Sequence, residues 1–201
     1  MIKNLIFDFG KVLVDYDYMT TLVEIFDTEA DAIDFLQHFV NGGWAEKFDR
    51  EDKPVDDIIA DMQREMPEYA SQIVEFDHRY TSLVTGEIEG MAALLTRLKG
   101  EGYKLYGLTN WCSRVRQTMK QYTIFNLLDG WIISSDEHII KPDQRIYKCI
   151  CERYGLVPAE CVFTDDREEN VKGAEQFGMK AILFTSAKQY EHDLQEIIEH
   201  A

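Results

Sequence analysis

Five short apolar segments, separated by stretches of helical periodicity, constrain the fold of this chain more than any other feature of its sequence. They lie at residues 5–7, 104–108, 131–133, 161–163 and 181–184. Apolar residues at helical spacing occur in the intervals, as Met91, Leu94 and Leu98 do shortly before the second segment. Short buried strands that alternate with helices are typical of a parallel sheet covered on both faces. We therefore expect an α/β fold with a parallel sheet.

Residues 15–85 differ from the rest of the chain in pattern and in charge. No strand pattern occurs there, and we expect three helices: from Asp27 or Thr28 to Asn41, from Pro54 to before Pro67, and from about Tyr69 to Leu83. This segment has 18 acidic and 5 basic residues, whereas the remaining 130 residues have 19 and 16. Such a shift predicts two domains. They are a core of residues 1–14 and 86–201, and a helical cap of residues 15–85.

The overall composition excludes several classes of partner. A formal charge of −16 disfavours nucleic acids and anionic membrane surfaces, and no apolar run approaches the ~18 residues of a membrane span. Asp8 interrupts the N-terminal apolar stretch before it could serve as a signal peptide. The four cysteines show no CxxC spacing, which favours free thiols in a reduced, cytoplasmic protein. The five histidines show no ligand spacing, and we assign them no role.

Polar side chains follow the strands at the points where we expect them to end. These residues are Asp8, Thr109, Asn110, Lys141, Asp165 and Asp166. Each alone could be a turn, helix-capping or surface residue. In a parallel sheet, however, the carboxyl ends of the strands meet at one edge, where ligands bind. Paired carboxylates favour Mg²⁺ over Zn²⁺, and a lysine with a hydroxyl can hold phosphate oxygens. The set predicts phosphoryl transfer through an aspartyl-phosphate.

Four short sequences in the chain resemble, in order, the four motifs of the haloacid dehalogenase (HAD) superfamily. They are FDFGKVLVD, GLTN, Lys141 followed by Pro142, and VFTDDREENVKGAEQFGMKAI. The resemblance extends from residue 4 to residue 184 and so covers nearly the whole chain. It implies a Rossmann-like three-layer core, with a small helical cap inserted after the first strand.

The resemblance also implies a role for each residue. Asp8 would be the nucleophile and a Mg²⁺ ligand, with the Gly10 carbonyl and Asp166 as further ligands. Lys141 would neutralise the charges of Asp8 and the substrate phosphate, and would bind the phosphoryl group together with Thr109 and Asn110. Asp165 and Asn170 would hold the loop on the metal side of the site.

One position departs from the family pattern. Most phosphatases of the superfamily have an aspartate, the general acid and base, where this chain has Gly10, and a glycine where it has Lys11. The pattern D-x-G-x-V is similar to that of bacterial α-glucose-1-phosphate phosphatases. The sequence therefore does not identify the residue that protonates the leaving group. We expect a preference for sugar 1-phosphates over 6-phosphates, which Gly10→Asp should narrow, because an anomeric oxygen needs less help from an acid.

We therefore expect a magnesium-dependent phosphatase, monomeric or homodimeric, that acts on a small phosphorylated metabolite such as glucose 1-phosphate. Two alternatives stay open: a metal-independent 2-haloacid dehalogenase that uses Asp8, and a non-catalytic phosphate-binding regulatory protein. The helical cap would select the substrate. Its aromatic residues could stack on a sugar ring or belong to the core; these are Tyr16, Tyr18, Trp44 and Phe48.

Overall fold

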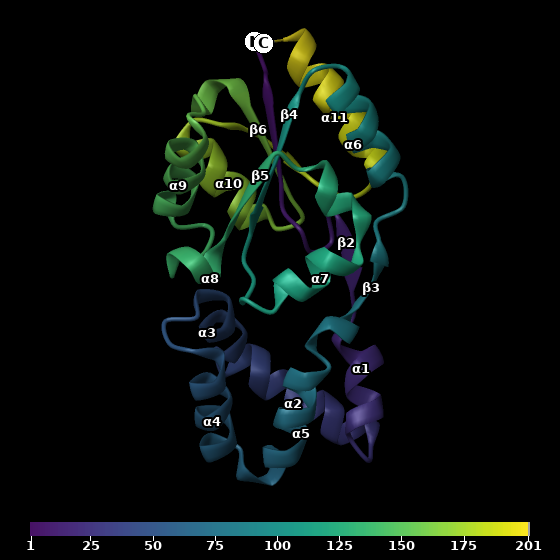
Figure 1. Cartoon of the computed structure of the whole chain (residues 1–201), viewed down its shortest axis with the longest axis vertical. Coiled ribbons are helices and arrows are strands. Elements are labelled where there is room, and N and C mark those ends of the chain that lie inside the picture. Colours follow the sequence, from purple (N-terminus) through teal and green to yellow (C-terminus); the bar gives the residue numbers. More distant parts are fainter. Residues whose placement is uncertain (201) are drawn as a thin grey trace.

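A parallel sheet of five strands forms the centre of the molecule in the computed structural model, which describes residues 1–200 (Figure 1). The strands are β1 (Asn4–Phe7), β4 (Lys104–Thr109), β5 (Gly130–Ile133), β6 (Cys161–Asp165) and β7 (Lys180–Leu183). Their order is β5-β4-β1-β6-β7, so β1 lies in the middle between β4 and β6. The predicted α/β class and the five predicted strands are confirmed.

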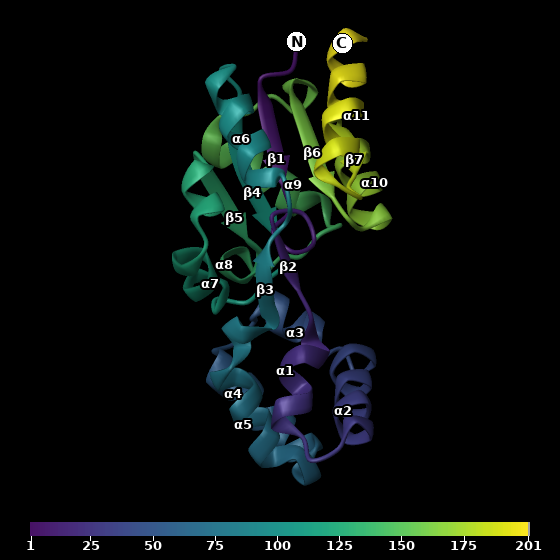
Figure 2. The same ribbon diagram turned by 90° about the vertical axis from the view of Figure 1, so that its right-hand side faces the viewer.

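Helices cover both faces of this sheet (Figures 1 and 2). Because side chains alternate along a strand, Leu5 and Phe7 pack on one face and Ile6 on the other. The first face is covered by α6 (Met91–Gly100) and α11 (Ala187–Glu199). The second is covered by α9 (Gln144–Tyr154) and α10 (Glu168–Phe177). The result is the three-layer arrangement that the alternating pattern predicts.

Shorter elements connect these layers. They are α7 (Val115–Gln121), α8 (Ser134–Glu137) and the 3₁₀ turns η3 (Thr123–Leu127) and η4 (Pro158–Glu160). The helical periodicity in the intervals between the apolar segments predicted α6, α7, α9 and α10, whereas α11, which follows the last segment, was not predicted. The four cysteines are free, and all but Cys149 are buried.

The helical cap lies beyond the carboxyl ends of the strands (Figures 1 and 2). It contains α1 (Tyr18–Ile25), α2 (Glu29–Asn41), α3 (Trp44–Arg50), α4 (Val55–Glu65), η1 (Pro67–Tyr69), α5 (Ala70–His78) and η2 (Tyr80–Leu83). Its interior is aromatic, with the ring of Phe39 centred 5.3 Å from that of Phe76 and 5.6 Å from that of Phe48. Two of the three helices expected here are observed, and the third is divided among η1, α5 and η2. Helices α1 and α3 were not predicted.

An antiparallel hairpin joins the helical cap to the sheet. It consists of β2 (Val14–Tyr16) and β3 (Val84–Glu87), and a β-bulge interrupts the pairing between Asp15 and Tyr16. The expectation that no strand occurs in residues 15–85 was therefore wrong at both ends of that segment. Unlike the strands of the sheet, β2 and β3 are not apolar runs, and with three and four residues they are too short for an alternation of apolar and polar residues to be recognised in the sequence.

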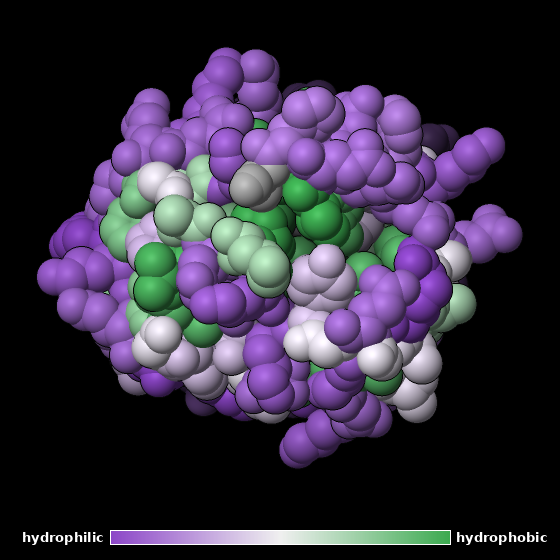
Figure 3. Space-filling model, turned by 90° about the horizontal axis from the view of Figure 1, so that it is seen from above, coloured by the Kyte–Doolittle hydropathy of each residue, from purple (hydrophilic) through white to green (hydrophobic). Residues whose placement is uncertain are grey.

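The end of the molecule remote from the helical cap carries the termini, and its surface is mostly hydrophilic with a smaller group of apolar side chains (Figure 3). Within residues 1–200, no helix is both long and apolar enough to cross a membrane.

Candidate active site

Asp8 directly follows the central strand of the sheet. Phe7 pairs with Gly107 of β4 on one side and with Thr164 of β6 on the other, so Asp8 emerges between the ends of these two strands. Its main-chain N–H donates to the Thr164 carbonyl, and its Oδ1 accepts from the N–H of Phe9 at 2.7 Å. The carboxylate is thus held at the edge of the sheet where the predicted polar residues converge.

The ammonium group of Lys141 bridges two carboxylates. Lys141 Nζ lies 2.9 Å from Asp8 Oδ1 and 2.6 Å from Asp165 Oδ2, and it donates a third hydrogen bond to the Leu108 carbonyl. Lys141 is almost completely buried. Burial lowers its pKa, but the charges of Asp165 and Asp8 outweigh this effect and hold the pKa above its ordinary value. The lysine therefore carries its positive charge in the site.

Asn110 fixes the main chain of Lys141. Its Nδ2 donates to the Lys141 carbonyl at 3.0 Å, and its Oδ1 accepts from the Lys141 N–H at 2.7 Å. The side-chain amide is therefore engaged with Lys141, although the sequence predicted that Asn110 would bind the phosphoryl group. Thr109, at the end of β4, also lines the site, and among residues 1–200 its hydroxyl has no hydrogen-bond partner.

Asp165 is fully buried and uses both carboxylate oxygens within the protein. Oδ2 accepts from Lys141, whereas Oδ1 accepts from the Arg167 N–H and from Asn170 Nδ2, each at 2.9 Å. These contacts hold the start of α10 against the sheet. Asp165 and Asn170 are therefore joined at the start of α10, and the loop-holding role that the sequence analysis gave them stays a prediction.

Asp8, Asp165 and Asp166 form an acidic cluster in which one carboxylate oxygen from each residue lies within 4.8 Å of the others. Burial raises the pKa of Asp8 to about 7 against the opposing effect of Lys141, and burial together with Asp165 raises the pKa of Asp166. Carboxylate oxygens close together repel each other unless a cation lies between them. Because these donors are all hard oxygen atoms, the cluster fits Mg²⁺.

The loop after Asp8 brings Gly10 into the wall of the site. The following residue, Lys11, has a left-handed backbone with φ of 59°, a conformation that glycine adopts at less cost. Lys11 is held there by its ammonium group, which donates to Asp15 Oδ1 and to the Tyr16 carbonyl. This geometry explains why the family pattern favours glycine at the position of Lys11.

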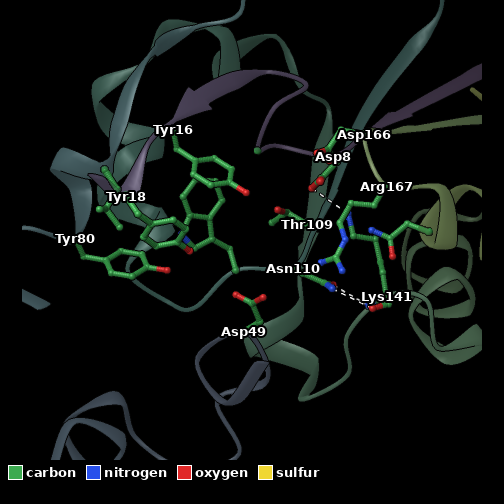
Figure 4. Close-up of a pocket in the computed structure, with 14 residues that line it drawn as sticks. Asp8, Tyr16, Tyr18, Asp49, Tyr80, Thr109, Asn110, Lys141, Asp166 and Arg167 are labelled. Atoms are coloured by element: carbon green, nitrogen blue, oxygen red, sulfur yellow. Dashed lines mark hydrogen bonds and ion pairs between the residues drawn. The ribbon is translucent and has the colours of Figure 1, made fainter. Parts of the chain in front are cut away.

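A cavity of about 100 Å³, partly open to solvent, lies between these groups and the helical cap (Figure 4). Tyr16, Tyr18, Tyr80 and Trp111 form its aromatic wall, and Arg167 lies on the opposite side. Of the aromatic residues considered in the sequence, Tyr16 and Tyr18 line this cavity. Trp44 and Phe48 are core residues.

Asp49 is a cavity residue that sequence reasoning missed. It comes from the end of α3, and in Figure 4 its carboxylate lies between the tyrosines and the Asp8–Lys141 side. Tyr80, Trp111 and Arg167 were missed as well. For Arg167 the adjacent Asp165-Asp166 pair was a usable signal. Nothing in the local sequence marks Asp49.

The site combines a carboxylate nucleophile candidate after the central strand, a buried lysine and an acidic cluster, all at the carboxyl edge of a parallel sheet. These features define a class of α/β hydrolytic enzymes in which a helical cap covers the site. Residues 2–178 match the family model of the haloacid dehalogenase-like hydrolases. The chain therefore belongs to that family. The narrower similarity to α-glucose-1-phosphate phosphatases stays a prediction.

Three comparisons describe its relatives. The sesquiterpene phosphatase astK of Aspergillus oryzae is 27% identical over 197 residues, which cover 98% of this chain and 96% of that protein. The (S)-2-haloacid dehalogenase 4A of Burkholderia cepacia is 33% identical over 92 residues, or 45% of this chain and 40% of that one. A HAD family enzyme of Bacteroides thetaiotaomicron shares the fold, with a TM-score of 0.77, 22% identity, and coverage of 96% and 98%. That enzyme has also been solved with magnesium and inorganic phosphate.

Proposed function

We propose that this chain is a magnesium-dependent phosphomonoester hydrolase that acts on a small phosphorylated metabolite through an aspartyl-phosphate. The observation that carries the proposal is the contact of Lys141 with Asp8 beside the acidic cluster. A carboxylate that is to attack a phosphoryl group needs its own charge and that of the phosphate offset. Lys141 supplies a fixed positive charge at that point.

Each residue then has a task that follows from its contacts. Asp8 attacks the phosphorus atom, Lys141 stabilises the negative charge on the phosphoryl oxygens, and the Thr109 hydroxyl donates to one of them. Asp8, the Gly10 carbonyl and Asp166 would hold Mg²⁺, which supplies further positive charge for the phosphoryl oxygens. Asp165 and Asn170 keep Lys141 and the start of α10 in place, so that little reorganisation accompanies the reaction.

Two observations favour a phosphatase over a dehalogenase. Asp166 faces the nucleophile candidate Asp8 within the acidic cluster, and carbon–halogen cleavage by a carboxylate has no need of such a cluster. A relative that matches nearly the full length of this chain is called a phosphatase, whereas the dehalogenase matches less than half of it. The paired Asp8 and Lys141 also argue against a purely phosphate-binding protein, because a carboxylate beside a phosphate weakens binding unless it reacts.

A sugar phosphate is the substrate that we favour. The cavity is lined by aromatic rings suited to stacking on a sugar, and the helical cap above it is strongly acidic. That charge disfavours substrates with several phosphate groups.

A screen of phosphorylated metabolites with and without Mg²⁺ tests the proposal. We expect phosphate release that depends on Mg²⁺ and that Asp8→Asn abolishes. Beryllium fluoride, a phosphoryl mimic, should inhibit only when Mg²⁺ is present. Magnesium-independent release of halide from chlorinated acids, without release of phosphate, would instead support the dehalogenase.

A further inference from the structure

The space in which the family's usual general acid would lie is occupied by an aromatic ring. A Cβ atom added at Gly10 would lie 2.8 Å from Cε1 and 3.3 Å from Cδ1 of Tyr16. That ring is itself packed edge-on against Tyr18 and Trp111, with centroids 5.6 Å and 6.2 Å apart. Gly10 therefore leaves room for Tyr16, and the proton of the leaving group has to come from another residue.

Asp49 is placed to supply it. Its carboxylate is half-buried in the cavity, and within residues 1–200 no hydrogen bond or ion pair engages it. The main chain around it is tied to the core: the Asp49 carbonyl accepts from Ser134 Oγ at 2.5 Å, and Glu51 Oε2 accepts from the Ser113 N–H at 2.7 Å. The backbone is thus fixed while the carboxylate stays available to a ligand.

The surroundings of Asp49 favour the protonated carboxyl. From the helical cap it faces the neutral phenols of Tyr18 and Tyr80, and Glu46 lies on its own helix. From the core it faces Asp8, Lys141 and Arg167, and the Cys112 thiol. Burial, with the charge of Asp8 next, raises the pKa of Asp49 to about 7. A carboxyl group with such a pKa can both give and take a proton near neutral pH.

We propose that Asp49 of the helical cap is the general acid and base of the reaction, in place of the residue that Gly10 replaces. The inference rests on the proposed function. When Asp8 attacks, the bond between phosphorus and the leaving oxygen breaks, its electron pair stays on that oxygen, and the Asp49 carboxyl protonates it to release an alcohol. The Asp49 carboxylate then takes a proton from water as the water attacks phosphorus. The bond to Asp8 breaks, and inorganic phosphate and the Asp8 carboxylate result.

Two substrates with different leaving groups separate this role from a structural one. An alkyl ester such as glycerol 3-phosphate needs a proton on its leaving oxygen, whereas p-nitrophenyl phosphate does not at neutral pH. For Asp49→Asn we expect kcat/KM to fall ~10²–10⁴-fold on the alkyl ester. On the aryl ester it should fall less than about tenfold, because kcat/KM reports only the steps up to release of the first product.

Asp52→Asn is the matched control, since Asp52 is exposed three residues away and does not line the cavity. It should leave kcat/KM unchanged on both esters, and Asp49→Glu should recover part of the loss on the alkyl ester. Equal losses of Asp49→Asn on the two esters, or no loss on the alkyl ester, would overturn the role of Asp49. A wild-type chain that releases phosphate from neither ester nor any substrate of the metabolite screen would overturn the proposed function itself, and the inference with it.

Discussion

Replacing Asp49 by asparagine should make the protein more stable above neutral pH, although it removes a residue that we propose to be essential for activity. Burial raises the pKa of Asp49 from 3.8 to about 7, so between these values the folded chain binds a proton that the unfolded chain has lost. Folding stability therefore falls as pH rises through this window. An asparagine cannot ionise, so the variant does not lose stability in this way as pH rises.

The size of the effect follows from the two pKa values. Each tenfold change in an acidity constant is worth about 1.4 kcal/mol, so the full difference is at most about 4 kcal/mol at pH 8. Solvent reaches part of the carboxylate and reduces the penalty. About a third of the pH range between the two pKa values lies below pH 5. The protein is least soluble there, close to its isoelectric point of 4.6, so the measurable range begins at pH 5. As pH rises from 5 to 8, we expect the free energy of unfolding of Asp49→Asn to increase relative to that of the wild type by on the order of 1–2 kcal/mol.

Urea unfolding in EDTA, followed by circular dichroism at several pH values, measures this difference directly. EDTA keeps bound metal from altering the charge of the neighbouring acidic cluster. The exposed control Asp52→Asn should run parallel to the wild type at every pH. If the Asp49→Asn and wild-type curves stay parallel from pH 5 to pH 8, the carboxyl is not buried as the structure has it, and the argument for its proton fails.

Three further predictions concern the nucleophile, the buried lysine and the substrate. Asp8→Asn should lower activity on the best substrate at least ~10³-fold, since the covalent route is lost; near-wild-type turnover in steady-state assays would remove Asp8 as the nucleophile. Lys141→Met leaves Asp8 and Asp165 without their buried cation, and urea unfolding at pH 8 should show a loss of about 3–5 kcal/mol. A loss below about 1 kcal/mol would mean that the pair is not buried. Even with Asp49 as the general acid, steady-state kinetics should give a higher kcat/KM for glucose 1-phosphate than for glucose 6-phosphate, because the anomeric leaving oxygen is the more acidic; equal values would show that leaving-group acidity does not shape specificity.

The core of the fold could be predicted from the sequence because its signals are local. Each of the five strands is a short apolar run that ends at glycine or a polar residue, and the helices between them show their own period. The β2–β3 hairpin was not predicted, because its strands of three and four residues are too short for an alternation such as Val14-Asp15-Tyr16 to stand out from the surrounding sequence. Helix α11 had a usable signal in Ser186 at its N-cap and in Tyr190 and Leu194, four residues apart.

The two sides of the site differ in the same way: the residues of the core could be predicted from the sequence, and Asp49 of the helical cap could not. Asp8, Thr109 and Asp165 could be predicted because parallel strands bring their carboxyl ends together whatever the rest of the chain does. The position of Asp49 depends on how α3 docks on the core, through contacts such as the Ser134–Asp49 hydrogen bond that joins residues 85 positions apart. No local pattern encodes such a contact.

Gly10→Asp tests whether Tyr16 and an acid at position 10 exclude each other. Gly10 has no left-handed backbone, so the cost of the substitution comes from the side chain. The new Cβ would lie 2.8 Å from Tyr16 Cε1, where 3.4 Å or more is ordinary contact. The ring cannot move freely, because Tyr18 and Trp111 pack against it. We expect Gly10→Asp to lower the free energy of unfolding by about 1–3 kcal/mol without raising activity.

Tyr16→Ala should remove this conflict. In a double-mutant cycle, the loss caused by Gly10→Asp should be smaller in the Tyr16→Ala background, with a coupling of about 0.5–3 kcal/mol measured by urea unfolding. The same pair of changes in an Asp49→Asn chain should restore part of the hydrolysis of an alkyl phosphate, since the carboxylate then has room beside Asp8. Gly10→Asp alone should therefore leave the preference between sugar 1-phosphate and 6-phosphate as it is, contrary to the expectation from the sequence. Strict additivity in the cycle would show that Tyr16 does not fill the space of the missing acid.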